Sequence, residues 1–211
     1  MIVAIESASP DQSVALAAPD GGTLATAAWT AERGQGSELL PRLLGLLAEQ
    51  GAGLDRVTGV AVGLGPGSFT GLRVGLALAK GLATGLGVPI AGVPSLEAWL
   101  SAEPDAEAAL VRSGAAEAWA LGRADTEPRL VAFDAVPDAA RDRILVAPRE
   151  LATTLGLARA VPPDGAAAAV ARMAASRLAS GAADDLARLE PVYLRPPRGL
   201  GEIGTETVTW L

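Results

Sequence analysis

Short apolar runs alternate with polar turns at the start of the chain, a pattern typical of strands joined by hairpins. Three such runs predict strands, at residues 2–5, 13–17 and 24–29. Asp20-Gly21-Gly22 is a strong hairpin signal between the second and third runs. Residues 37–50 then carry leucines at helical spacing on more than one face, which predicts a helix with Ser37 as its N-cap.

The stretch from residue 57 to residue 85 predicts a buried strand, a glycine loop and a long helix in direct succession. The apolar run at 57–62 suits a strand covered on both faces, and it stops at Gly63-Leu64-Gly65-Pro66-Gly67. Three glycines around a proline allow a tight loop whose backbone approaches another group closely. Either Ser68 or Thr70 can cap the helix that follows.

Small residues recur every four positions along this predicted helix, so one of its faces is nearly bare backbone. They are Gly67, Gly71, Gly75, Ala79, Ala83 and Gly87. A glycine inside a helix costs about 1 kcal/mol relative to alanine. The row therefore predicts that another helix or a ligand packs very close to this face.

The remaining pattern predicts a strand at 88–93, a helix starting at 95–100 and a boundary near residues 103–105. Three leading strands followed by alternating helices and strands imply a mixed sheet. Beyond the boundary, short strands are expected at 108–112, 117–121, 129–133 and 144–146, and helices at 148–155 and 165–178. The predicted domains are 1–103, 104–197 and a tail at 198–211.

Composition removes several classes of function. The net charge of −7 argues against unaided binding to nucleic acid or an anionic membrane. The chain has no cysteine and no histidine, which excludes disulfides, zinc–thiolate and histidine metal sites, cysteine nucleophiles and Ser-His-Asp triads. The start of the chain lacks a basic signal-peptide region, and no run approaches about 18 apolar residues, so a cytoplasmic protein is expected.

Two loops invite comparison with nucleotide sites. The glycine loop follows a strand and opens a helix, but Ser68 stands where the dinucleotide fingerprint has its third glycine, and no lysine and Ser/Thr pair completes a P-loop. Glu6-Ser7 ends the first strand, where the actin, Hsp70 and sugar-kinase superfamily has a phosphate loop with aspartate. A structural turn is the alternative to a vestigial nucleotide loop. The candidate loop residues are Glu6, Ser7, Gly65, Gly67 and Ser68.

Four segments together resemble one known family. They are IVAIESASPDQSVAL, GSELLPRLLGLLAEQ, VTGVAVGLGPGSFTGLRVGLALAKGLATGLGVPIAGVPSLEA and PVYLR. In this order they are similar to the TsaB family, the dimerisation subunit of the bacterial machinery that makes N6-threonylcarbamoyladenosine at position 37 of tRNAs reading codons that begin with A. The resemblance implies an α/β fold of two actin-like (ASKHA, ribonuclease H-like) lobes with mixed sheets and flanking helices. It also implies pairing with the catalytic paralogue TsaD and association with the ATPase TsaE.

The chain departs from the family pattern in three places. Glu6-Ser7 replaces the usual aspartate-threonine, Gly36 replaces a common histidine, and residues 111–119 have lost a second-lobe motif. The first departure weakens the case for nucleotide binding. The third puts the usual surface of the second lobe in doubt.

The resemblance favours a non-catalytic scaffold without metal or cofactor, which contacts tRNA only through its complex and pairs with itself when alone. The alternative is a free-standing nucleotide-dependent enzyme of the same superfamily; a metalloprotease would lack any histidine ligand. Partner contact is expected through the helices at 37–50 and 69–85. The residues expected at that interface are Leu39, Leu40, Leu43, Leu46, Leu47, Gly71, Leu72, Gly75, Leu76 and Ala79.

Overall fold

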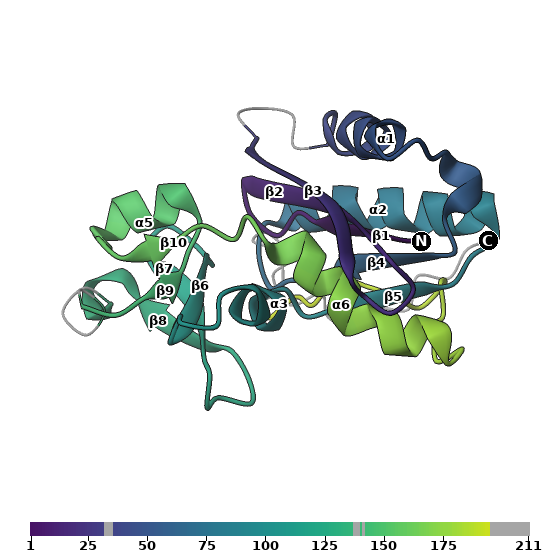
Figure 1. Cartoon of the computed structure of the whole chain (residues 1–211). Coiled ribbons are helices and arrows are strands. Elements are labelled where there is room, and N and C mark those ends of the chain that lie inside the picture. Colours follow the sequence, from purple (N-terminus) through teal and green to yellow (C-terminus); the bar gives the residue numbers. More distant parts are fainter. Residues whose placement is uncertain (32–35, 137–139, 141, 195–211) are drawn as a thin grey trace, which may run out of the picture.

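Two five-stranded sheets lie side by side in the chain, each with its own helices (Figure 1). The computed structural model describes residues 1–31, 36–136, 140 and 142–194. The first sheet contains β1 (Ile2–Glu6), β2 (Asp11–Ala17), β3 (Thr23–Thr30), β4 (Gly59–Gly63) and β5 (Ile90–Val93). The second contains β6 (Ala108–Arg112), β7 (Glu117–Gly122), β8 (Arg129–Ala132), β9 (Leu145–Val146) and β10 (Ala160–Val161).

The two sheets repeat one topology. The first has the order β3-β2-β1-β4-β5, and the second has the order β8-β7-β6-β9-β10, which is the same arrangement of successive strands. In each sheet the first three strands pair antiparallel and the last two join in parallel. The expected fold of two related lobes with mixed sheets is therefore confirmed, including the relation between the halves that their sequences do not show.

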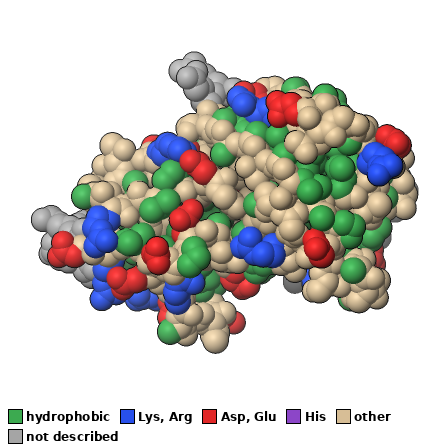
Figure 2. All heavy atoms as spheres, in the orientation of Figure 1, with side chains coloured by type: hydrophobic (Ala, Val, Ile, Leu, Met, Phe, Trp, Pro, Cys, Tyr) green, Lys and Arg blue, Asp and Glu red, His purple; other side chains and the backbone are tan. Residues whose placement is uncertain are grey.

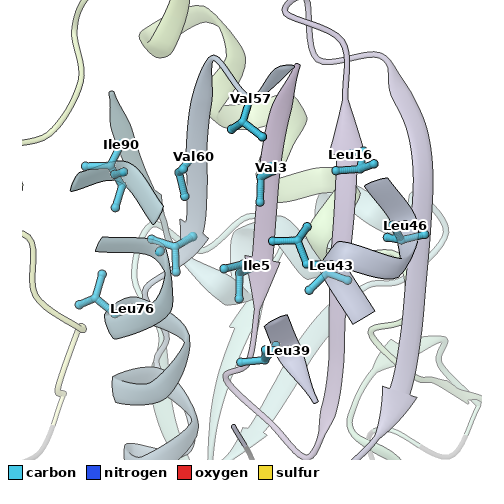
Figure 3. Packing of buried hydrophobic residues seen from close by; sticks show 14 of the residues in the cluster. Val3, Ile5, Leu16, Leu39, Leu43, Leu46, Val57, Val60, Leu76 and Ile90 are labelled. Atoms are coloured by element: carbon cyan, nitrogen blue, oxygen red, sulfur yellow. The ribbon is translucent and has the colours of Figure 1, made fainter. Parts of the chain in front are cut away.

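Helices cover both faces of the first sheet. α1 (Leu39–Glu49) and α2 (Phe69–Leu86) lie on one face, and leucines of α1 point at β1 and β2 (Figure 3). α6 (Ala166–Ala179) crosses β1, β2, β4 and β5 on the other face. The contact with α6 is mostly alanine on both sides, and small side chains let the helix approach the sheet closely.

α3 (Ser95–Ala102) lies at the junction of the two lobes, against α6 and also against β6 and β7. Its Trp99 is fully buried in an apolar cluster that includes Leu121 and Val146 of the second sheet. The second lobe also has α5 (Arg149–Leu155), a helix of 7 residues between β9 and β10. The lobes therefore share an apolar core at their junction.

The helix starts show which capping predictions hold. Of the two caps that the sequence allowed, Ser68 and not Thr70 caps α2, accepting the N–H of Gly71 at 3.2 Å. α1 begins later than expected, with Glu38 rather than Ser37 at the N-cap, and no side chain caps it. Glu38 instead pairs with Arg42 one turn on, at 2.8 Å.

The chain returns to the first lobe after completing the second sheet. α6 comes from residues that the sequence assigned to the second domain, yet it packs on the first sheet. The division at residues 103 and 104 stays a prediction, and the predicted tail at 198–211 lies outside the described residues. Within the described part of the chain, no helix is both long and apolar enough to cross a membrane.

Candidate functional site

The β1–β2 turn and the glycine loop are bonded into one unit. The N–H of Ser68 donates to the carbonyl oxygen of Ala8 at 2.7 Å, and Ser7 Oγ donates to the carbonyl of Gly71 at 2.9 Å. The N–H of Gly65 donates to Ser95 Oγ at 2.9 Å. The structure thus brings the residues of the predicted vestigial nucleotide loop together, and much of their hydrogen-bonding capacity is used within the chain.

The small-residue row of α2 faces this turn. A Cβ at Gly67 would overlap the backbone of Ala8, and a Cβ at Gly71 would overlap the carbonyl oxygen of Ser7. A Cβ at Gly75 would meet Ser7 Oγ. The prediction that another helix or a ligand covers the row is wrong at these positions, because the chain's own β1–β2 turn fills that space.

Glu6 is turned into the protein. It is fully buried; its Oε1 accepts the N–H of Ala8 at 2.7 Å, whereas Oε2 lies beside Ser95 and Trp99 without a hydrogen bond of normal geometry. Burial raises the pKa of Glu6 from its usual 4.5, because the charged form loses its hydration. A carboxylate in this position is not available to hold metal-bound water at the surface.

A cleft of about 630 Å³ lies between the lobes beside this unit. Its walls come from the β1–β2 turn, the glycine loop, the β6–β7 turn, the start of α5 and the segment after α6. The lining residues are Ala8, Ser9, Pro10, Pro66, Gly67, Ser68, Phe69, Val111, Arg112, Ser113, Gly114, Trp119, Pro148, Glu150, Leu151, Val192, Tyr193 and Leu194. Its size is that of a small-molecule site.

The charged groups of the cleft are already paired. Arg112 donates to Thr154 Oγ1 at 3.2 Å, lies 3.3 Å from Glu150 and sits over the ring of Phe133. Sequence pattern does not mark Arg112 and Glu150 as site residues, because the pair forms only when β6 and α5 come together. The cleft therefore presents prolines and aromatic rings more than free charge.

An aromatic and arginine cluster stands at the mouth of the cleft. The rings of Phe69 and Tyr193 lie 5.3 Å apart, and Arg73 lies over Phe69 while donating to the hydroxyl of Tyr193 at 3.1 Å. Phe69 and Tyr193 are each 38% exposed. Sequence pattern does not bring these side chains together, because Tyr193 lies 120 residues beyond Arg73.

The expected interface residues lie mostly in the chain's own core. The leucines at 39, 43, 46, 47, 72 and 76 and Ala79 are buried, as are Gly71 and Gly75, whereas Leu40 is 38% exposed. Helical spacing alone did not show which α1 leucines face the sheet. Side chains that are buried in this way cannot contact a partner, so these interface assignments are corrected. If a partner docks on the two helices, it must contact their exposed residues.

No group of three or more acidic side chains that could hold a metal ion occurs among the residues that the structure describes. Asp184 accepts the N–H of Gly92 at 2.7 Å and pairs with Arg177. It thereby fastens the segment after α6 to β5.

These features define a two-lobed α/β protein with a cleft between lobes of one repeated topology. A family model described as "TsaD: tRNA N6-adenosine threonylcarbamoyltransferase" matches residues 26–162. The chain belongs to this family, and within it to the TsaB branch.

The relatives support that assignment. The chain is 43% identical over 72 residues to the tRNA threonylcarbamoyladenosine biosynthesis protein TsaB of Haemophilus influenzae, covering 34% of this chain and 30% of that protein. It is 38% identical over 95 residues to TsaB of Escherichia coli, covering 45% and 40%. The chain thus spans less than half the length of these curated relatives.

A solved structure agrees over nearly the whole chain. YeaZ from Pseudomonas aeruginosa superposes with a TM-score of 0.66 at 25% sequence identity, covering 92% of this chain and 99% of that one. The likeness therefore includes the second lobe, where the sequence resemblance is weak.

Proposed function

We propose that this chain is a non-catalytic pairing subunit in the biosynthesis of N6-threonylcarbamoyladenosine at position 37 of tRNA. In this proposal it docks on the catalytic TsaD protein, TsaE joins the pair, and tRNA is bound by the complex rather than by this acidic chain. The family assignment and the names of its TsaB relatives support the pathway. The pairing role rests on a surface of the first lobe.

That surface is the exposed side of α1 and α2. Leu40 and Leu44 of α1 are 38% and 41% exposed, and Val74, Leu78 and Leu82 follow one another at four-residue intervals on α2, each half-buried. Apolar side chains gather over these two helices in Figure 2. Exposed large apolar side chains concentrated on one face are typical of a protein–protein interface. This face is the single observation that carries the proposal.

The test is a double variant, Leu40→Glu with Leu44→Glu. A stable interface buries about 1,200–2,000 Å² in total, and two carboxylates at its centre would be desolvated without partners. We expect co-purification with TsaD to be lost, and sedimentation of the lone chain to shift from dimer to monomer. The melting temperature should stay near that of the parent, since both side chains are exposed.

Leu24→Glu is the matched control. Leu24 is 47% exposed on β3 and lies outside α1 and α2, so its replacement should leave pairing intact. Retention of TsaD by the double variant, or equal loss in the control, would contradict docking through this face.

A nucleotide-dependent enzyme is the second candidate, because the cleft adjoins the glycine loop. Against it, Glu6 is buried with its carboxylate bonded inside the chain, and Arg112 is already paired. Calorimetry of the lone chain with ATP and magnesium separates the two. Saturation at millimolar ATP, with turnover lost in Glu6→Ala, would favour the enzyme and overturn the scaffold.

A further inference from the structure

The chain passes between the lobes twice, and each passage is bonded by an arginine of the second lobe. The first passage runs from α3 to β6, and the second runs from β10 to α6. Two lobes joined by a double connection commonly open and close by a hinge at these points. The two arginines, Arg123 and Arg149, are called here the interlobe arginines.

Arg123 follows β7 and binds the end of α3. Its Nη2 donates to the carbonyl oxygens of Leu100 at 3.0 Å and Glu103 at 2.6 Å, and its Nε donates to the carbonyl of Ala106 at 2.6 Å. The last carbonyls of a helix have no partner within the helix and carry partial negative charge, so a guanidinium is well suited to them. These bonds span the residues that lead from α3 into β6.

Arg149 is the first residue of α5 and binds the start of β2. Its backbone N–H donates to Asp11 Oδ2 at 2.6 Å, and its Nη1 donates to Asp11 Oδ1 at 3.0 Å. Asp11 is 3% exposed and also accepts the hydroxyl of Thr30 at 2.6 Å. The buried carboxylate of the first lobe thus fixes the helix start of the second.

The guanidinium of Arg149 also bonds to the second connection between the lobes. Arg149 forms a two-bond pair with Asp164, at 2.9 and 2.6 Å, and Asp164 lies on the connection from β10 to α6. The hydrogen bonds to Asp164 and Asp11 raise the pKa of Arg149, so it stays charged. Bidentate, charge-assisted hydrogen bonds between arginine and a carboxylate are among the stronger hydrogen bonds in proteins.

We propose that the interlobe arginines lock the two lobes, so that the cleft has one fixed width. The locked groups adjoin the cleft directly, because Pro10 precedes Asp11 and both neighbours of Arg149 line the wall. With the apolar cluster around Trp99 between them, the two arginines fasten the junction at both passages. A ligand or partner therefore meets a preformed cleft rather than closing one.

The experiment measures the distance between lobes in the full chain. The chain has no cysteine, so a spin label attaches only where a cysteine is introduced. We choose Thr26→Cys on β3 and Ala132→Cys on β8, which are both exposed. In the otherwise unaltered chain we expect one narrow distance. Arg123→Met and Arg149→Met together should add a second, longer distance, since losing charge-assisted hydrogen bonds changes an equilibrium by roughly 10- to 100-fold per site.

Arg177→Met is the matched control. Arg177 also donates to a carbonyl, that of Gly92, and pairs with an aspartate, but all of these groups lie on the first lobe. The control should keep the narrow distance. If the double variant does not fold, the single variant Arg123→Met provides the test. Its carbonyl partners can accept hydrogen bonds from water instead, and no buried charge is left without a partner. A broad distance in the labelled parent, or a narrow one in the folded arginine variants, overturns the lock.

Discussion

Glu6 stands at the end of β1, where the sequence predicts a vestigial nucleotide loop, but its side chain turns into the protein toward Ser95 and Trp99. Trp99 Nε1 and Glu6 Oε2 are both buried without a hydrogen-bond partner. A buried carboxyl that is poorly satisfied is more stable neutral than charged.

This environment predicts a pH dependence of stability. Because burial raises the pKa of Glu6, the native state holds the proton more tightly than the unfolded chain. The stability that Glu6 contributes is full below its usual pKa of 4.5 and is lost as pH rises through the raised value. Glu6→Gln should thus match the parent at low pH and exceed it at pH 7, by about 1–3 kcal/mol.

Melting curves of both proteins from pH 4 to pH 8 check this expectation. Glu97→Gln, an exposed change on α3, should leave the pH profile as it is in the parent. A constant difference between Glu6→Gln and the parent at every pH would show that the pKa of Glu6 is the same in the native and unfolded states, and would contradict the effect of burial.

At the scale of the element, α2 contains two kinds of glycine. Gly71 and Gly75 face Ser7, whereas Gly81 and Gly85 have open space where a Cβ would stand. Only the first kind is needed for the close approach of helix and turn. The small residues at four-residue spacing thus reflect a contact within the chain. The sequence alone could not distinguish such a contact from one with a ligand or a partner.

A pair of alanine substitutions separates the two kinds. Gly81→Ala should stabilise the protein by about 1 kcal/mol through helix propensity. Gly71→Ala should destabilise it by about 1–3 kcal/mol, because the added methyl overlaps the carbonyl oxygen of Ser7 and the turn must shift. Urea denaturation of both variants measures the difference. Equal stabilisation by the two changes would mean that the turn yields without cost.

Most helices and strands could be predicted from the sequence, and the predictions that failed did so for physical reasons. The strand at Ala108–Arg112 and the helix from Phe69 follow from apolar runs and a serine cap. β10 was missed because Ala160 and Val161 stand between an arginine and two prolines, whereas the two residues of β9 belong to an apolar run. The pairing of Asp184 with β5 was missed because it depends on where the segment after α6 returns in space.

At the scale of the whole molecule, the first lobe is completed by the far end of the chain. α6 covers β1, β2, β4 and β5, although about seventy residues separate it from the last of these strands. Local pattern predicts that residues 165–178 are helical, but not which sheet they cover. The interlobe cleft escapes prediction for the same reason, since its walls come from five separate segments.

This arrangement predicts that residues 1–103 do not fold alone. Without α6, the alanine-rich face of the first sheet would lie open to water, and so would the junction side of α3. We expect the fragment to lack a cooperative melt by circular dichroism, while the full chain unfolds in one transition. A fragment that melts cooperatively would establish it as an independent domain.

The helices α2 and α5 hold equivalent places in the two sheets but differ in length. α2, between β4 and β5, has 18 residues, while its counterpart α5, between β9 and β10, has 7, or about two turns. Among the described residues, the docking face that we propose on the long helix therefore has no counterpart of similar length on the second lobe. One self-complementary face closes a pair, whereas a second on the same chain would let copies add end to end into fibres. Because the two helices are unequal, we expect self-association to stop at a dimer, and the repeated topology of the two lobes does not lead to a polymer.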